Sequence, residues 1–192
     1  RSWVAQRITY IETFEAKEKD AGLEKLALLI GDVIGEKDGV GLAYKLGEIY
    51  FNDLKNYEAA AVQFANAINS GMSDSRFVDA LYLRGRSYEL LTLKDQKYRK
   101  PAIEAYETFL QSYPSDRRAT QTTFALFELR STTLPAARAA YSQVLAAHPD
   151  FPQHDEMLLR IGSLLESADS STEALATYSS LISWYPHSNS AE

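Results

Sequence analysis

Residues 155–188 read DEMLLRIGSLLESADSSTEALATYSSLISWYPHS, and this stretch decides the fold. Its apolar residues recur every three to four positions in two successive runs, which is the spacing that places them on one face of an α-helix. The positions concerned are Ile161, Gly162 and Leu165 in the first run, and Ala174, Tyr178 and Leu181 in the second. Pro186 follows and cannot continue a helix. The stretch therefore predicts a pair of amphipathic helices.

The second of these helices has three relatives elsewhere in the chain. Each copy has an alanine, an aromatic residue four positions later, and an apolar pair three and four positions after the aromatic residue. The four copies span Ala60–Ile68, Ala102–Leu110, Ala137–Leu145 and Ala174–Ile182. A residue that ends a helix follows each copy, namely Gly71, Pro114, Pro149 and Pro186. The alanine allows a neighbouring helix to approach closely, and the aromatic ring fills the groove beside it.

A helix that contains a glycine precedes three of the four copies. These glycines are Gly47, Gly85 and Gly162, each within an apolar pattern such as Leu46-Gly47-Glu48-Ile49-Tyr50. A glycine inside a helix costs roughly 1 kcal/mol relative to alanine. Its recurrence at one place predicts a contact at which a side chain would clash.

The combined pattern, Leu-Gly-x-x-Tyr followed by Tyr-x-x-Ala-x-x-x-Phe-x-x-Ala and then Pro, resembles the tetratricopeptide repeat. The resemblance covers residues 40–188. It implies an all-α fold, a right-handed α-solenoid of about five antiparallel helix pairs. Four repeats are expected at about 40–72, 73–115, 116–150 and 151–188 in a single continuous solenoid, with a degenerate repeat or capping helix pair at 1–39.

The repeats depart from the pattern in three places. The first has one extra residue before Tyr57, and the second has an insertion, Leu91 to Lys100, after which Pro101 begins the second helix. In the third, the first helix (Thr122 to Arg130) has no glycine, and its register is ambiguous by one residue. No polar capping helix follows the last pair, so we expect the array to continue in a longer protein, or its end to be covered.

Composition narrows the classes of function. The chain has 192 residues and a net charge of −6, which argues against a general affinity for nucleic acid or an anionic membrane surface. It has no cysteine, and no apolar run approaches the roughly 20 residues that span a bilayer. The chain begins with Arg1 and shows no signal peptide, as a processed chain or a fragment would.

In the tetratricopeptide family the first helix of each pair lines a concave groove that holds extended peptides or partner helices. The resemblance carries this role to three sets of residues. They are Tyr44, Glu48, Phe51 and Asn52, then Tyr82, Arg86 and Glu89, and finally Leu159, Ser163 and Glu166. Tyrosine and arginine are frequent interface hot spots, which favours Tyr44, Phe51, Tyr82 and Arg86 as binding residues. The family's clamp for a terminal carboxylate uses several basic residues, and only Arg86 fits that role here.

Other constellations could carry chemistry. The stretch from His148 to Glu156 has two histidines and three carboxylates and could bind a divalent metal, or it could be an ordinary loop between repeats. The stretch from Lys94 to Lys100 could be a basic patch or a solvated loop. No phosphate-binding glycine loop and no catalytic serine, histidine or zinc motif occurs, so we expect neither an enzyme nor a cofactor.

The sequence thus predicts a non-catalytic scaffold that binds a protein or peptide in its groove. A structural module that self-associates through its uncapped ends is the alternative, and a metal-dependent enzyme that uses the His148–Glu156 loop is a third. We expect no nucleic-acid partner and no direct membrane insertion. The phrases at 106–115 and 184–188 resemble envelope-associated bacterial members of the family, which slightly favours the periplasm or the outer membrane over the cytoplasm.

Overall fold

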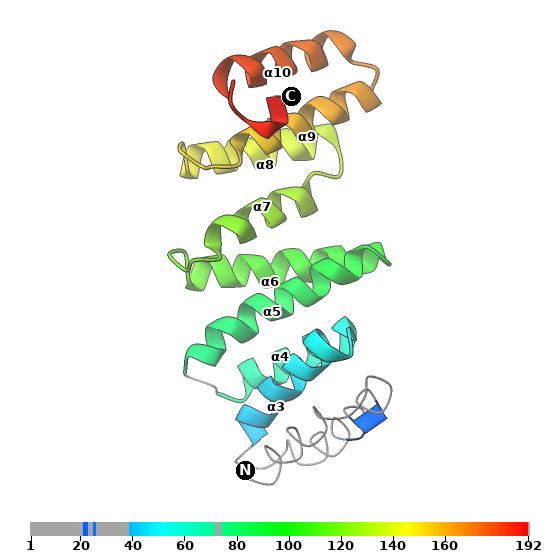
Figure 1. The fold of residues 1–192 in the computed structure, drawn as a ribbon, viewed down its shortest axis with the longest axis vertical. Helices are drawn as coiled ribbons and strands as arrows, with labels where there is room; N and C mark the ends of the chain where they lie inside the picture. Colours follow the sequence, from blue (N-terminus) through cyan, green and yellow to red (C-terminus); the bar gives the residue numbers. More distant parts are fainter. Residues whose placement is uncertain (1–20, 23–24, 26–38, 72–73, 192) are drawn as a thin grey trace. The chain divides into compact units, whose positions relative to one another are not determined.

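The computed structural model describes residues 21–22, 25, 39–71 and 74–191, and this part of the chain consists of helices and connecting turns, without a strand (Figure 1). The predicted all-α helix-pair architecture is therefore confirmed for the described residues. The helix pair predicted at residues 1–39 lies almost entirely outside them. None of the described helices combines the length and the hydropathy needed to cross a membrane.

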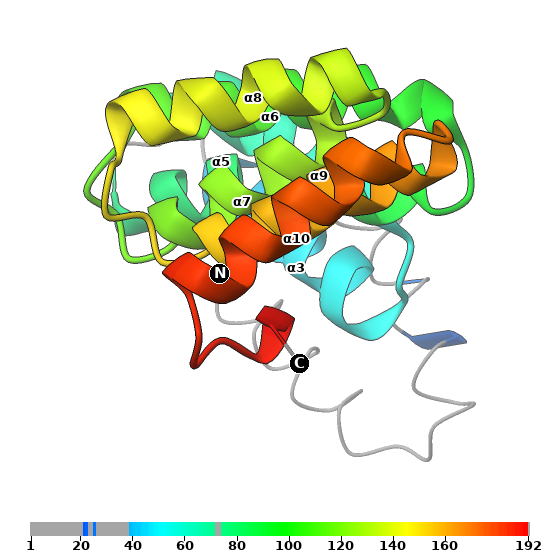
Figure 2. The same ribbon diagram turned by 90° about the horizontal axis from the view of Figure 1, so that it is seen from above.

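The helices belong to two compact units, residues 1–109 and 110–192. The first unit contains α3 (Gly39–Glu48), the π-helical turn η1 (Ile49–Asp53), α4 (Tyr57–Asn69), α5 (Ser75–Thr92), the 3-10 turn η2 (Gln96–Tyr98) and most of α6 (Arg99–Ser112). The second contains α7 (Ala119–Arg130), α8 (Leu134–Ala147), α9 (His154–Ser167), α10 (Ser171–Trp184) and the 3-10 turn η3 (Asn189–Ala191). Figure 2 shows α9 and α10 side by side, with the last described residues turning away from the end of α10.

The predicted helix ends agree with the structure. α6, α8 and α10 each stop two residues before a proline, and Gly71, just after α4, has a φ of +83°, a backbone conformation that glycine adopts readily. Side chains cap several helix starts. The Asn56 side chain accepts a hydrogen bond from the Ala59 backbone N–H at 3.1 Å, a type of cap worth about 1 kcal/mol.

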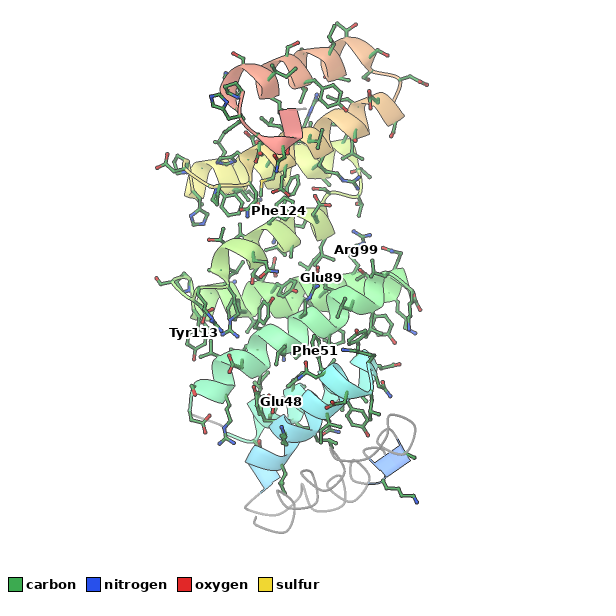
Figure 3. The ribbon with its side chains drawn as sticks, viewed as in Figure 1. Glu48, Phe51, Glu89, Arg99, Tyr113 and Phe124 are labelled. Carbon is green, nitrogen blue, oxygen red and sulfur yellow. The ribbon has the colours of Figure 1, made fainter. Side chains whose placement is uncertain are left out.

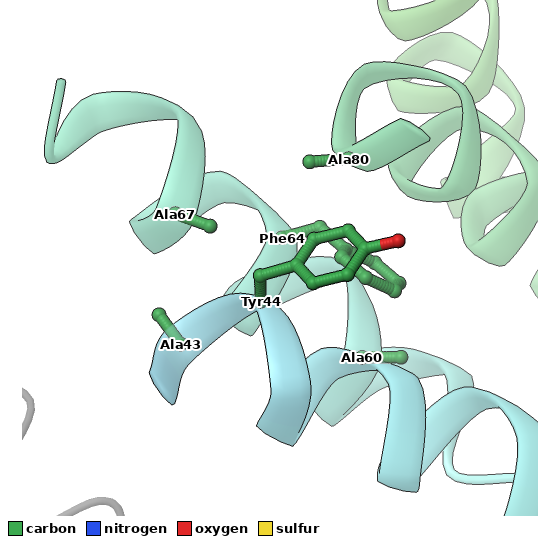
Figure 4. Packing of buried hydrophobic residues seen from close by; sticks show 6 residues of the cluster. All are labelled: Ala43, Tyr44, Ala60, Phe64, Ala67 and Ala80. Atoms are coloured by element: carbon green, nitrogen blue, oxygen red, sulfur yellow. The ribbon is translucent and has the colours of Figure 1, made fainter. Parts of the chain in front are cut away.

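The core of the first unit forms where α3, α4 and α5 meet (Figure 4). Phe64 of α4 is fully buried, and its ring centroid lies 5.9 Å from that of Tyr44 on α3. The small residues Ala60 and Ala80 are buried in the same cluster and leave room for the two rings. The alanine-plus-aromatic pattern therefore packs as its residue types predict.

The three recurrent glycines each lie against the aromatic ring of the following helix. A Cβ atom added at Gly47 would lie 2.7 Å from a ring carbon of Phe64, and one added at Gly85 would lie 2.5 Å from a ring carbon of Tyr106. A Cβ atom at Gly162 would overlap the ring of Tyr178 in the same way. The predicted contact that excludes a side chain is confirmed in all three helix pairs.

The structure corrects the extent of the insertion predicted at 91–100. α5 continues to Thr92, η2 begins at Gln96 and α6 begins at Arg99, so most of the stretch is helical. The Asp95 side chain caps η2 by accepting a hydrogen bond from the Lys97 backbone N–H at 2.9 Å. The extra residues lengthen the helix pair and are not an open loop.

Packing in the second unit shows which face is buried on α7, the helix whose register was ambiguous in the sequence. Thr122, Leu126 and Leu129 are buried at helical spacing, and Phe127 is buried beside them in a cluster with Ala140 and Met157. The Thr122 hydroxyl donates to the Arg118 carbonyl at 2.8 Å, so this polar group is satisfied inside the core. Phe124 and Glu128 are left only partly buried on α7.

Candidate functional site

The residues predicted for the groove on α3 and η1 differ in how far a partner could reach them. Tyr44 is buried against Phe64, and Phe51 is half-buried, with its ring centroid 5.4 Å from that of Tyr57. Glu48 lies 3.5 Å from the ammonium group of Lys45, and Asn52 is exposed. Figure 3 labels Glu48 and Phe51, whose side chains are both partly buried.

The residues predicted on α5 are bound to one another and to α6. The Arg86 guanidinium lies 2.6 Å from the Glu89 carboxylate, which also accepts a hydrogen bond from the Tyr106 hydroxyl. Tyr82 is half-buried, and its ring centroid lies 5.7 Å from that of Phe109. These side chains form an internal network in the first unit, which we call the Glu89 network.

The electrostatics of the Glu89 network follow from its burial. Burial raises the pKa of Tyr106, and the neighbouring Glu89 charge and hydrogen bond raise it further. Burial acts to lower the pKa of Arg86, but the Glu89 hydrogen bond and charge outweigh it, so the pKa lies above its ordinary value. Tyr106 therefore stays a neutral hydrogen-bond donor, and Arg86 stays charged.

An open groove of about 920 Å³ lies in the second unit, which we call the α7/α9 groove. Its lining comes from α7, from α9 and from the segment that follows Pro186. The lining residues are Phe124, Glu128, Asp155, Glu156, Leu159, Arg160, Ser163, His187, Ser188, Asn189 and Ser190. The groove includes two of the predicted residues, Leu159 and Ser163. The third, Glu166, lies outside the lining and accepts a hydrogen bond from the Tyr178 hydroxyl at 3.1 Å.

Apolar and acidic side chains share the walls of the α7/α9 groove. Leu159 is 40% exposed, and Phe124, labelled in Figure 3, is partly buried with its ring 6.2 Å from that of Phe127. The Arg160 Nε atom is 4.0 Å from a Glu128 carboxylate oxygen, too far for a hydrogen bond, while Nη2 donates to the Ser131 carbonyl at 3.3 Å. The one arginine of the lining is thus only loosely paired with the carboxylates around it.

Glu128 lies in an environment that disfavours its charged form. Burial raises the pKa of this carboxyl group, Arg160 acts in the opposite direction, and the negative charge of Glu156 raises the pKa further. The net direction is upward. The α7/α9 groove therefore contains a partly buried carboxylate whose charged form is disfavoured, mainly by its burial.

The segment after Pro186 is held at the rim of the groove by α9. The Ser188 hydroxyl donates to the Asp155 carboxylate, and the Ser190 backbone N–H donates to the Ser188 hydroxyl oxygen at 2.9 Å. These bonds bring His187 into the lining. They also occupy Asp155, so that Glu128 and Glu156 are the carboxylates of the lining with the weakest pairing among the described residues.

Sequence reasoning missed much of this groove. Phe124 and Glu128 were not predicted because the glycine that fixes the register is absent from α7. The available signal was their spacing of four, which equals the spacing of Leu159 and Ser163 on α9. Arg160 and Glu156 were on the correct helix and were not selected.

The two other candidate sites from the sequence, the basic stretch 94–100 and the stretch 148–156, have charged or polar side chains that are paired locally or buried. Lys97 lies 3.2 Å from Asp95 and 4.7 Å above the Tyr98 ring, so part of the basic charge at 94–100 is balanced within the turn. His154 is buried, with its Nε2 atom 3.0 Å from the His148 carbonyl oxygen. Within the described residues, no three histidine, aspartate or glutamate side chains are grouped as a metal ion would require.

Comparison with known proteins identifies the repeat and the fold. Sequence models of the tetratricopeptide repeat match residues 79–116 and 125–189. No curated protein sequence matches the chain. Among solved structures, the chain is similar to YrrB, described as a TPR protein with an unusual peptide-binding site. The TM-score is 0.56 and the identity 19%, over 92% of this chain and 81% of that one. The protein therefore contains tetratricopeptide repeats, and its fold is the helical solenoid fold of proteins built from them.

Proposed function

We propose that this protein is a non-catalytic interaction scaffold that binds a segment of a partner protein in the α7/α9 groove. The open groove of about 920 Å³ carries this proposal, because its size lies toward the upper end of the range of ligand pockets, about 300–1,000 Å³. Its lining combines an exposed leucine, an aromatic ring and charged groups, as binding sites for peptides commonly do. The tetratricopeptide repeats and the peptide-binding site named for YrrB support a peptide as the ligand class.

The first unit supports a smaller contribution to binding. Phe51, Asn52 and Tyr82 keep exposed or half-buried surface, whereas Tyr44 serves mainly as core. Arg86 and Glu89 hold each other, so a ligand would have to compete for them. Their role in binding remains a prediction, as does the envelope location indicated by the sequence phrases.

Replacing Leu159 with asparagine tests the groove. We expect peptides selected on the intact chain from a phage-displayed library of random dodecapeptides to lose affinity for Leu159→Asn by about tenfold or more, because the change replaces an apolar contact with an uncharged polar group on the apolar wall. Fluorescence anisotropy with the selected peptides measures the effect.

Leu145→Asn is the matched control, since Leu145 on α8 is 43% exposed and lies outside the groove lining, against 40% for Leu159. It should bind the selected peptides as the unaltered chain does, and thermal melts should show both variants folded. Equal affinities for both variants would place the binding site elsewhere and end the proposal.

Exposed apolar side chains on α10 favour self-association as the second candidate. Leu175 and Ile182 stand two helical turns apart on one face, and both are exposed. Single soluble chains seldom leave such side chains grouped without a partner. If this face joins two copies, sedimentation velocity should show a dimer that Leu175→Ser with Ile182→Ser dissociates. A monomer at the highest soluble concentration contradicts this candidate.

A further inference from the structure

We infer that the α7/α9 groove selects a peptide that carries a lysine or arginine side chain beside an apolar side chain. This inference rests on the proposed function and specifies its ligand.

The charges of the groove lining carry the argument. Three carboxylates line it, those of Glu128, Asp155 and Glu156, against one arginine, Arg160. The Arg160 guanidinium lies 4.0 Å from Glu128 and donates one N–H to the Ser131 carbonyl. Its single positive charge therefore only partly neutralises the three carboxylates. A cation placed between α7 and α9 would complement this excess of negative charge.

Glu128 and Glu156 are the pair best placed to receive that cation. They come from different helices, and the negative charge of Glu156 acts, after burial, to raise the pKa of Glu128. Glu156 is exposed and makes no ion pair with another described residue. An ammonium or guanidinium group near both carboxylates would turn this repulsion into two attractive contacts.

The apolar wall defines the rest of the ligand. Leu159 and Phe124 line the same groove as the two glutamates. Lysine and arginine can lay an aliphatic stem on such a wall while the charged head reaches a carboxylate. A neighbouring leucine or phenylalanine of the peptide would cover the exposed part of Leu159. An acidic ligand would instead find one arginine among three carboxylates, on a chain whose net charge is already −6.

Selection from the random dodecapeptide library supplies the test. Peptides that lose binding to Leu159→Asn should be enriched in lysine or arginine next to an apolar residue. Changing Glu128→Gln together with Glu156→Gln should weaken these peptides by about 10- to 100-fold, and added salt should weaken their binding to the intact chain. A version of each peptide with glutamate in place of its basic residue should fail to bind.

A second double variant controls for the overall charge. Glu104→Gln with Glu173→Gln removes the same two negative charges from exposed positions outside the groove lining, and it should leave the affinity within about twofold. A loss that is equal in the two double variants would show a general charge effect and overturn the inference.

The pH dependence of peptide affinity is an independent test of the basic ligand. A bound cation favours the Glu128 carboxylate, so binding should release protons and the affinity should rise with pH through the carboxyl range. Glu156, Asp155, Arg160 and His187 face the same space, so Glu128→Gln should flatten this rise without abolishing it.

The outcomes separate the two proposals. If the groove-dependent peptides are neutral or acidic, the basic ligand is wrong and the scaffold function stands. If the selection returns no peptide that depends on Leu159, both are wrong.

Discussion

Replacing Tyr106 with alanine is expected to lower the free energy of unfolding by about 3–5 kcal/mol, the range measured for aromatic residues removed from protein cores. The side chain is 1% exposed, and its ring fills the space against Gly85. Its hydroxyl donates to Glu89, which also holds Arg86. The change removes the ring and leaves a cavity where α5 and α6 pack. Urea titration followed by circular dichroism measures the loss.

The conservative change Tyr106→Phe separates the ring from the hydroxyl. It keeps the contact with Gly85 and removes only the hydrogen bond to Glu89, so we expect a loss of about 1 kcal/mol. Glu89 keeps its ion pair with Arg86 in this variant. Similar losses for Tyr106→Ala and Tyr106→Phe would show that ring packing is not the main contribution at this position.

Replacing Gly85 with alanine is expected to destabilise the first unit by about 1–3 kcal/mol, although alanine is the better helix former by about 1 kcal/mol. The reason is steric, since the new Cβ would lie 2.5 Å from a carbon of the buried Tyr106 ring. The ring cannot move aside without disturbing its contact with Tyr82, 6.3 Å away between centroids. Thermal and urea unfolding of the variant measure the effect.

Gly41→Ala is the matched control in the same unit. Gly41 also lies in a helix, α3, but among the described residues its Cβ would meet only the Arg76 guanidinium at 3.1 Å, the far end of a flexible side chain. Its helix propensity should therefore dominate, and we expect a gain of about 0.5–1 kcal/mol. Changes of the same sign at Gly41 and Gly85 would contradict the steric account.

The helix pairs could be predicted because their signals are local. The alanine, the aromatic residue and the following proline or glycine lie within one helix and its end, so spacing alone reveals them. The glycines at 47, 85 and 162 predicted a close contact, and the ring in contact is the aromatic residue of the next helix in each case. Prediction succeeded where all the residues that determine a feature lie within one helix pair.

The binding surface could not be predicted to the same depth because exposure depends on neighbours distant in sequence. Tyr44 and Leu159 received the same predicted role, yet Tyr44 fills space left by small alanines such as Ala60 and Ala80, and Leu159 remains exposed. The rim of the α7/α9 groove depends on a hydrogen bond between Ser188 and Asp155, which are 33 positions apart. Neither residue type nor helical spacing indicates that bond.

The glycine–aromatic contact also bears on how the chain folds. It closes three of the described helix pairs between residues near in sequence, and in two of these pairs a tyrosine–glutamate bond joins residues only 17 and 12 positions apart. Contacts of such short sequence separation need little loop closure, and proteins rich in them fold fast. Each of these three pairs can therefore act as its own folding nucleus, and they can form in the order in which they leave the ribosome.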